Sequence, residues 1–192
     1  MNDKLLANIR FYFAQSVFNS NCHFKAYNRL TKRKNQLSNF VVTLSAITLI
    51  LLILQVIGLE QKNQSLLNVL AFIGMLITGT SLVFEMFNKD DKSQEIFQHK
   101  MYAEKYKNLR DEYMGLIEET MSNTISDTEL RSKKDDLQKR YSVIGENAPE
   151  TTGEDYKQAQ IGLGLDGNSG EEFTWADKEI DLFLPEQLRL KK

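Results

Sequence analysis

Two long uncharged runs, separated by one short polar segment, constrain this chain more than any other feature. The runs are 40–59 (FVVTLSAITLILLILQVIGL) and 66–84 (LLNVLAFIGMLITGTSLVF), and neither contains a charged residue. A helix rises about 1.5 Å per residue, so about twenty residues reach the roughly 30 Å of a bilayer's hydrocarbon core. Buried helices of soluble proteins usually carry a polar stripe and seldom stay uncharged for this length. We therefore predict two membrane-spanning helices rather than a soluble helical hairpin.

The polar segment between the runs, 60–65 (EQKNQS), is too short for the helices to part, so we expect an antiparallel pair. A secretory signal peptide does not fit, because the first run begins well inside the chain and a second run follows it. The predicted fold class is an all-α membrane protein, with a two-helix transmembrane hairpin and a cytoplasmic helical domain formed from both chain ends. The predicted division is a cytoplasmic arm (1–38), a first transmembrane helix (39–59), an external loop (60–65), a second transmembrane helix (66–87), a cytoplasmic helical region (88–145) and a C-terminal extension (146–192).

Basic residues gather beside the first run. Five of them lie close together: Lys25, Arg29, Lys32, Arg33 and Lys34. Lys89 and Lys92 follow the second run, whereas the segment between the runs has only Lys62. Positive charge stays on the cytoplasmic side of a membrane, so we expect both termini in the cytoplasm and the loop outside. A basic triplet beside a span is more often an anchor to anionic headgroups than a nucleic-acid site, so no direct nucleic-acid binding is expected.

Small and polar side chains form one stripe on each run. On the first run they fall within an arc of about 100°: Ser38, Ser45, Thr48 and Gln55. On the second they recur at helical spacing: Gly74, Thr78, Ser81 and Glu85. Such stripes let helices pack closely and hydrogen-bond across an interface, or they line an aqueous path in an oligomer. A carboxylate in or beside a span is costly, so Glu85 marks either a pathway or a pairing with a nearby basic residue.

The first 38 residues predict two helices. Apolar residues recur every four positions in the first of them: Leu5, Ile9, Phe13 and Val17. The sequence Asn19-Ser20-Asn21 should interrupt this helix, because Asn and Ser prefer caps and turns. A second helix over 24–37 then leads into the first span. Two positions stay open for this arm, against the membrane surface or against the later cytoplasmic helices.

Beyond residue 88 the sequence predicts a long charged helix with one packed edge. The residues of this seam alternate spacings of four and three: Tyr102, Tyr106, Leu109, Tyr113 and Leu116. The seam packs either on the N-terminal helix or on a neighbouring subunit. Ser126 and Glu129 have the spacing of a capping box, which predicts the start of a helix. Gly145 marks the expected end of this helix. Two short helices, 155–161 and 177–184, should follow, with a glycine-rich loop over 162–170 between them.

No part of the sequence favours catalysis. Cys22 is the sole cysteine, and neither it nor the two histidines repeat a metal-ligand spacing, so we expect no metal site. Gly162, Gly164 and Gly167 match the G-x-G-x-x-G dinucleotide fingerprint, but the strand that this motif requires is missing upstream. No serine, cysteine or threonine has a nearby histidine or carboxylate arrangement that suggests an activated nucleophile. We expect neither a cofactor nor an enzyme activity.

The segment 24–39 (FKAYNRLTKRKNQLSN), followed by two spans and a long charged helix, resembles the bacterial SLATT family. The similarity before the first span is carried by Ala26, Arg29, Leu30 and Asn39. It covers residues 5–145 by topology, and the tail 141–192 resembles the extension of one subgroup. The resemblance implies an antiviral membrane effector acting by abortive infection, encoded beside nucleotide-second-messenger synthases, nucleotide-sensing domains or reverse transcriptases. It also implies oligomerisation and a breach of the bacterial inner membrane.

Three hypotheses follow from the residues and the resemblance together. The first is a homo-oligomeric pore-forming effector whose polar stripes contribute to the conducting path. The second is a non-conducting membrane scaffold that docks a cytosolic partner, such as a nucleotide sensor, a synthase or a reverse transcriptase. The third is a membrane enzyme, which would need an unrecognised site in the tail. The expected partners are the lipid bilayer, further copies of the chain, and a nucleotide second messenger or a cytosolic defence-system protein.

Overall fold

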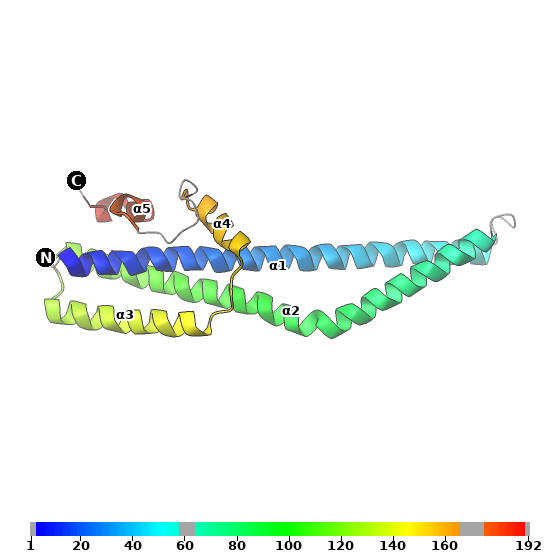
Figure 1. Cartoon of the computed structure of the whole chain (residues 1–192), viewed down its shortest axis with the longest axis horizontal. Coiled ribbons are helices and arrows are strands. Elements are labelled where there is room, and N and C mark those ends of the chain that lie inside the picture. The colour runs from blue at the N-terminus through cyan, green and yellow to red at the C-terminus, as the bar shows by residue number, and fades with distance from the viewer. Residues whose placement is uncertain (1–2, 58–63, 166–174, 191–192) are drawn as a thin grey trace. The chain divides into compact units, whose positions relative to one another are not determined.

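The computed structural model of the chain describes residues 3–57, 64–165 and 175–190, and its regular elements there are all helical (Figure 1). Two helices are very long, and the remaining elements become shorter toward the C-terminus. The elements in chain order are α1 (Asp3–Ile57), α2 (Gln64–Met121), α3 (Asp127–Asn147), α4 (Gly153–Gly162), α5 (Asp177–Asp181) and a 3-10 turn, η2 (Glu186–Leu188).

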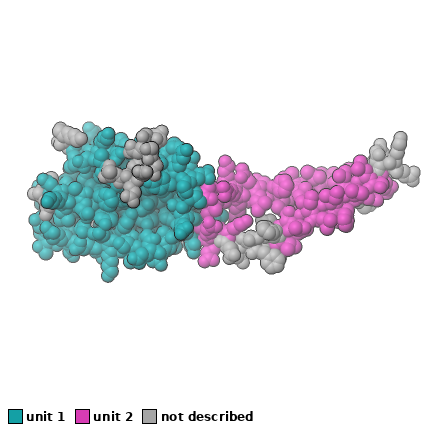
Figure 2. Space-filling model, viewed as in Figure 1, with its two compact units in different colours: residues 1–28, 96–192 teal, residues 29–95 magenta. Residues whose placement is uncertain are grey.

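The chain divides into two compact units, coloured separately in Figure 2. Residues 1–28 and 96–192 form one, here called the core unit, and residues 29–95 form the other, here called the apolar unit. Both α1 and α2 contribute to each unit, since neither helix breaks between them.

The core unit is built where the N-terminal part of α1 packs on α2 and α3 (Figure 1). The apolar residues predicted at every fourth position are all buried in it: Leu5, Ile9, Phe13 and Val17. Tyr12 stacks on Tyr113 with ring centroids 6.0 Å apart and meets Tyr141 edge-on at 5.3 Å. Fully burying an aliphatic or aromatic side chain of this size contributes about 1.5–3 kcal/mol. The N-terminal arm therefore packs against the later helices, one of the two positions that the sequence left open.

The predicted interruption of the first helix at residues 19–21 is wrong, because α1 continues through them. Their side chains find partners that do not require the helix to end. Asn19 donates to the Tyr141 hydroxyl at 2.8 Å, and Ser20 donates to the Ala103 carbonyl of α2 at 2.9 Å. Asn21 donates to the Val17 carbonyl one turn back. Packing partners thus outweigh the weak local preference of Asn and Ser for caps.

The capping signals place the starts of the shorter helices. Ser126 accepts a hydrogen bond from the backbone N–H of Glu129, as its box predicted, and α3 runs to Asn147, two residues past Gly145. Thr152 and Asp155 form a full capping box at the start of α4, whose bounds enclose the predicted 155–161. The last helix was predicted to reach Leu184 but ends at Asp181. The chain turns there and places Leu184 in the core.

In the apolar unit, the second half of α1 lies against the first half of α2. Side-chain contacts run in antiparallel order, with Lys34 Nζ donating to Ser93 Oγ at 3.0 Å and Thr48 lying beside Thr78. Two segments, Asp3–Leu54 and Gln64–Val83, are long and apolar enough to cross a membrane. In their most apolar stretches only 11% and 6% of residues are buried, so neither resembles the core helix of a soluble protein.

Most of the predicted external loop lies outside the described residues, which resume at Gln64. Helix α2 begins there, so Gln64 and Ser65 are helical rather than part of a loop. Gly167 of the glycine motif also lies outside the described residues. Gly162 ends α4 and Gly164 has a φ of +71°, and the described residues that precede them form helices, not the strand that a dinucleotide site requires.

Candidate functional site

The two polar stripes meet each other inside the apolar unit. We name this region the span contact and define it by its residues on α1 and α2: Val41, Ser45, Thr48, Ala71, Gly74, Thr78 and Ser81. Val41, Thr48 and Ala71 are buried, and the others are partly buried. All seven are small or β-branched, the side chains that allow two helices to approach closely in a membrane.

Thr48 is the centre of the span contact. Its Oγ1 donates to the Leu44 carbonyl at 2.9 Å and lies 3.4 Å from the Thr78 Oγ1, while only 5% of the residue is exposed. Gly74 leaves room for it, since a Cβ at position 74 would lie 2.8 Å from the Thr48 Oγ1. Hydroxyl groups predicted for this stripe are therefore turned toward the other helix of the same chain.

The rest of the predicted stripe is distributed around this centre. Ser45 donates to the Val41 carbonyl at 2.8 Å, which satisfies its hydroxyl within α1. Ser81 is partly buried one turn beyond Thr78. The side chains of Gln55 and Glu85 lie outside the described residues, so their predicted roles stay predictions.

The outward faces of both segments are apolar. Large exposed side chains cover them, among them Phe40, Val42, Ile47, Leu49, Ile50, Ile53, Leu66, Val69, Phe72, Leu76 and Val83. Exposed polar residues interrupt this surface, among them Thr43, Asn68 and Thr80. The Thr43 and Thr80 hydroxyls each donate to a backbone carbonyl of their own helix, at 2.8 and 2.7 Å. A surface of this kind suits the hydrocarbon of a bilayer.

Gly74→Ala should push the two segments apart, whereas Gly79→Ala should not. A Cβ at Gly74 meets Thr48, but a Cβ at Gly79 has no atom within 4 Å. Overpacking of this kind costs typically about 1–3 kcal/mol. We expect the distance between spin labels at Val42 and Val83, two exposed positions, to lengthen in Gly74→Ala and to stay unchanged in Gly79→Ala. Equal distances in the two variants would contradict the close contact at Gly74.

The predicted basic anchors divide between the two units. Lys25 is partly buried, with its Nζ 3.3 Å from where a Cβ of Gly162 would lie. Arg29 is partly buried as well, whereas the triplet Lys32, Arg33 and Lys34 is exposed on α1. The triplet lies before the first apolar stretch, and its role as an anchor to anionic headgroups stays a prediction.

All five residues of the predicted seam are buried in the core unit: Tyr102, Tyr106, Leu109, Tyr113 and Leu116. Their ring contacts are within the chain, since Tyr106 meets Tyr141 of α3 at 5.7 Å and Tyr113 stacks on Tyr12 of α1. Of the two packing partners that the sequence left open for this seam, the N-terminal helix is the one in contact with it.

A buried histidine pair extends the seam, although no motif in the sequence predicts it. The Nδ1 atoms of His23 and His99 lie 3.1 Å apart, and the His23 ring stacks on Tyr106 at 5.7 Å. The two residues are 76 positions apart, which is why no local spacing joined them. A signal was present, because His99 precedes Tyr102 by three and Tyr106 by seven residues and so continues the seam.

Burial changes the chemistry of the groups around this pair. The pKa of His23 falls from 6.5 to about 4, mainly because burial disfavours the charged ring, with His99 adding to the shift and the Asp155 charge opposing it. Burial also raises the pKa of the neighbouring Cys22 thiol to about 12, with a contribution from Asp155. A thiol of this pKa is unreactive at neutral pH.

Acid should destabilise the core unit through His23. Its pKa in the folded chain, about 4, lies below the 6.5 of the unfolded chain, so between these values the folded chain binds fewer protons. Stability is complete above pH 6.5 and is lost as pH falls toward 4. We expect a loss of about 2 kcal/mol between pH 7.5 and 5, measured as thermal unfolding of the detergent-solubilised chain. His23→Phe, which keeps a ring against Tyr106, should flatten this dependence, and an unchanged slope would contradict the assignment.

Arg10 is a second buried group that no sequence motif predicts. It lies on α1 and is fully buried, and its Nη2 donates to the Asp181 carboxylate at 2.6 Å. Asp177 lies 3.8 Å away, and Nη1 donates to the Leu188 carbonyl at 3.3 Å. The acceptors come from α5 and η2, 171 residues away in the case of Asp181. A buried cation thus ties the end of the chain to its beginning.

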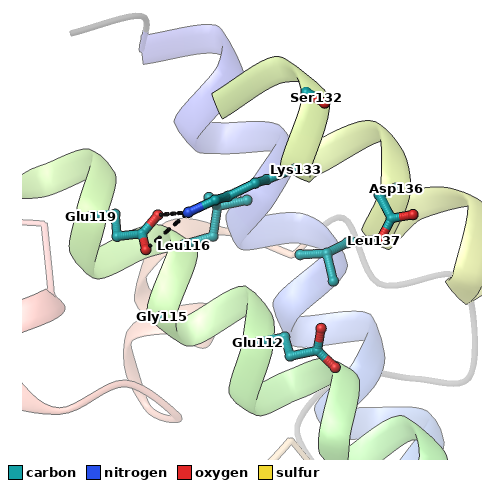
Figure 3. A pocket seen from close by; sticks show the side chains of 8 residues that line it. All are labelled: Glu112, Gly115, Leu116, Glu119, Ser132, Lys133, Asp136 and Leu137. Atoms are coloured by element: carbon teal, nitrogen blue, oxygen red, sulfur yellow. Dashed lines mark hydrogen bonds and ion pairs between the residues drawn. The ribbon is translucent and has the colours of Figure 1, made fainter. Parts of the chain in front are cut away.

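Between α2 and α3 lies an open groove with charged walls (Figure 3). Lys133 donates to both carboxylate oxygens of Glu119, at 3.2 and 3.0 Å. Gly115 lines the groove without a side chain, and a Cβ there would have no atom within 4 Å. Arg140 makes a two-pronged pair with Glu112 at the same edge. Exposed pairs of this kind contribute little to stability, so we assign the groove to the docking of α3 rather than to chemistry.

The profile of one protein family matches most of the chain. It is described as "SMODS and SLOG-associating 2TM effector domain family 4" and covers residues 5–179, which include both apolar segments, the span contact and the histidine pair. Comparisons with curated proteins and with solved structures return no match.

Proposed function

Because the chain belongs to the SMODS and SLOG-associating 2TM effector domain family, we propose that it is a membrane effector that forms a pore as a homo-oligomer. The protein is a membrane protein with two candidate spans. In our proposal these spans cross the bacterial inner membrane as an antiparallel hairpin. The basic triplet at residues 32–34 keeps both termini in the cytoplasm, and the core unit is the cytoplasmic assembly domain.

The observation that carries the proposal is the placement of polar groups within the spans. Outward faces hold large apolar side chains, while the hydroxyls of Thr48 and Thr78 meet within the span contact. Polar groups at the centre of a span are costly, and they are commonly kept for packing or for a pathway. We assign these hydroxyls to a pathway, a role that is compatible with the family's description as an effector.

Dye release from vesicles tests this proposal. The purified full chain is reconstituted into vesicles of phosphatidylethanolamine and phosphatidylglycerol that contain carboxyfluorescein, over a range of protein-to-lipid ratios. A pore predicts release that rises steeply with the ratio, because several copies must assemble. Vesicles that stay intact, while cross-linking shows the chain to be oligomeric, would contradict the pore.

The second candidate is a non-conducting scaffold, and the buried pair between Arg10 and Asp181 favours it. The family's description links these domains to SMODS and SLOG partners, and a core unit whose C-terminal segment is tied to α1 through Arg10 and Asp181 gives such a partner an ordered surface to bind. Under this function the chain recruits a nucleotide sensor or a synthase without conducting ions. Neither function involves catalysis, and we propose that the chain is not an enzyme.

A further inference from the structure

The centre of the span contact is closed to water within a single chain. Thr48 is almost fully buried, its hydroxyl is 3.4 Å from that of Thr78, and Gly74 is packed directly against it. A lumen would need these hydroxyls to face water. In this arrangement they face the other helix.

An assembly of such closed pairs would have a different lining. The surfaces that one pair presents to another carry large apolar side chains, such as Phe40, Leu49, Phe72 and Leu76. The exposed hydroxyls of Thr43 and Thr80 are already donated to carbonyls of their own helices. A channel bounded by apolar side chains expels water and closes, which is how hydrophobic gates work in ion channels.

We propose that the span contact is the gate of the pore, and that the two spans of each chain must separate at Thr48, Gly74 and Thr78 before ions pass. This inference rests on the proposed pore function and adds the movement that opens the pore. Separation exposes the hydroxyls of both helices to a common lumen, while the apolar outward faces stay in lipid. The contact suits a gate because small residues and one hydroxyl pair hold it, with no ion pair among its described residues.

A reversible covalent lock tests the gate. The double variant Thr48→Cys/Gly74→Cys places two cysteines where the Cβ–Cβ distance would be 3.5 Å, within the range of about 3.5–4.5 Å that disulfides adopt. The native Cys22 should not interfere, since it is buried and its pKa is raised to about 12. The full chain is reconstituted as for dye release, at the ratio where the wild type leaks, and oxidised or reduced before the assay.

We expect the oxidised double variant to release dye at least about tenfold more slowly than its reduced form, because a locked contact keeps the lumen dry. Dithiothreitol should restore release. The single variants Thr48→Cys and Gly74→Cys control for oxidation itself. Neither can form the link within one chain, so each should release dye equally fast in its oxidised and reduced forms. Intact-mass measurement after alkylation counts the linked chains.

Each result supports or overturns the gate. Full cross-linking with unchanged release would overturn it and leave the pore intact, since the lumen would then lie between closed pairs. Failure to cross-link in this variant and in Thr48→Cys/Thr78→Cys would overturn it too, because the contact itself would be absent. A wild type that releases no dye at any ratio contradicts the pore and removes the gate with it.

Discussion

Thr48→Val/Thr78→Val should slow dye release by about tenfold or more, because it removes two hydroxyls from the conducting path while keeping their shape. A tenfold change corresponds to a barrier raised by about 1.4 kcal/mol, a modest effect for two groups that would hydrate an ion in an apolar tunnel. The variant should still fold and assemble, since valine and threonine have the same branching. Release is measured in the vesicle assay, with the oligomer counted by cross-linking.

The matched control for this prediction is Thr43→Val/Thr80→Val. These two hydroxyls are exposed on the outward faces and are bonded to their own helices, so their loss should leave release unchanged. Equal effects of the two double variants would point to a general change in hydrophobicity. A scaffold would show neither effect and would keep its partner in both variants.

Asp181→Ala should strongly destabilise the packing of the C-terminal extension on α1. It removes the 2.6 Å partner of a guanidinium that is 1% exposed and leaves that charge in the core. Breaking a buried pair from one side typically costs about 3–5 kcal/mol. We expect about 3 kcal/mol, because the Leu188 carbonyl and Asp177 stay near Arg10. A loss of this size lowers the melting temperature by roughly 6–12 °C for a chain of this length.

The chain offers its own reporter for this loss. Trp175 is the sole tryptophan, it is buried, and its ring lies 5.9 Å from that of Phe18 on α1. Its fluorescence should therefore shift as the extension leaves α1. Asp177→Ala is the control, since that carboxylate is half exposed and 3.8 Å away, and we expect less than about 1 kcal/mol from it. The pair assignment would be wrong if both variants melted alike.

A companion variant separates charge burial from packing. Arg10→Met combined with Asp181→Ala removes both partners and leaves an apolar side chain at a site that packs against α5 and η2. Buried ion pairs replaced by apolar residues of similar volume are often neutral in stability. The double variant should therefore melt above Asp181→Ala alone.

How far the sequence could predict this structure depended on the distance over which each signal acts. The two apolar segments follow from the absence of charge, and the start of α3 follows from a cap within four residues. Helix α4 begins two residues before the predicted Asp155, at a Thr152 capping box that the prediction did not include. The apolar periodicity of α1 and the seam of α2 can each be recognised from the residues on one face of a single helix. These patterns are local, so they predict helices and helix ends without knowledge of which distant residues pack against them.

What the sequence could not reveal depended on partners far along the chain. Asn19 and Ser20 look like helix breakers until Tyr141 and the Ala103 carbonyl are placed beside them. From the sequence alone Arg10 resembles a surface cation, because its partner Asp181 lies near the C-terminus of the chain. For the polar stripes, the pattern was visible, but only the structure showed Thr48 of one stripe against Gly74 and Thr78 of the other.

The side-chain hydrogen bonds that join α1 to α2 and α3 restrict which helix motions are possible within the core unit. Apolar seams with spacings of four and three are nearly degenerate, because sliding one helix by two turns puts similar side chains opposite one another. The hydrogen bonds from Ser20 to α2, from Asn19 to Tyr141 and from Gln138 to the Tyr12 hydroxyl remove that degeneracy, since each fits at one axial register only. A ratchet-like slip of α1 would break all three at once, so tilting or splaying of the bundle is the motion left open to it.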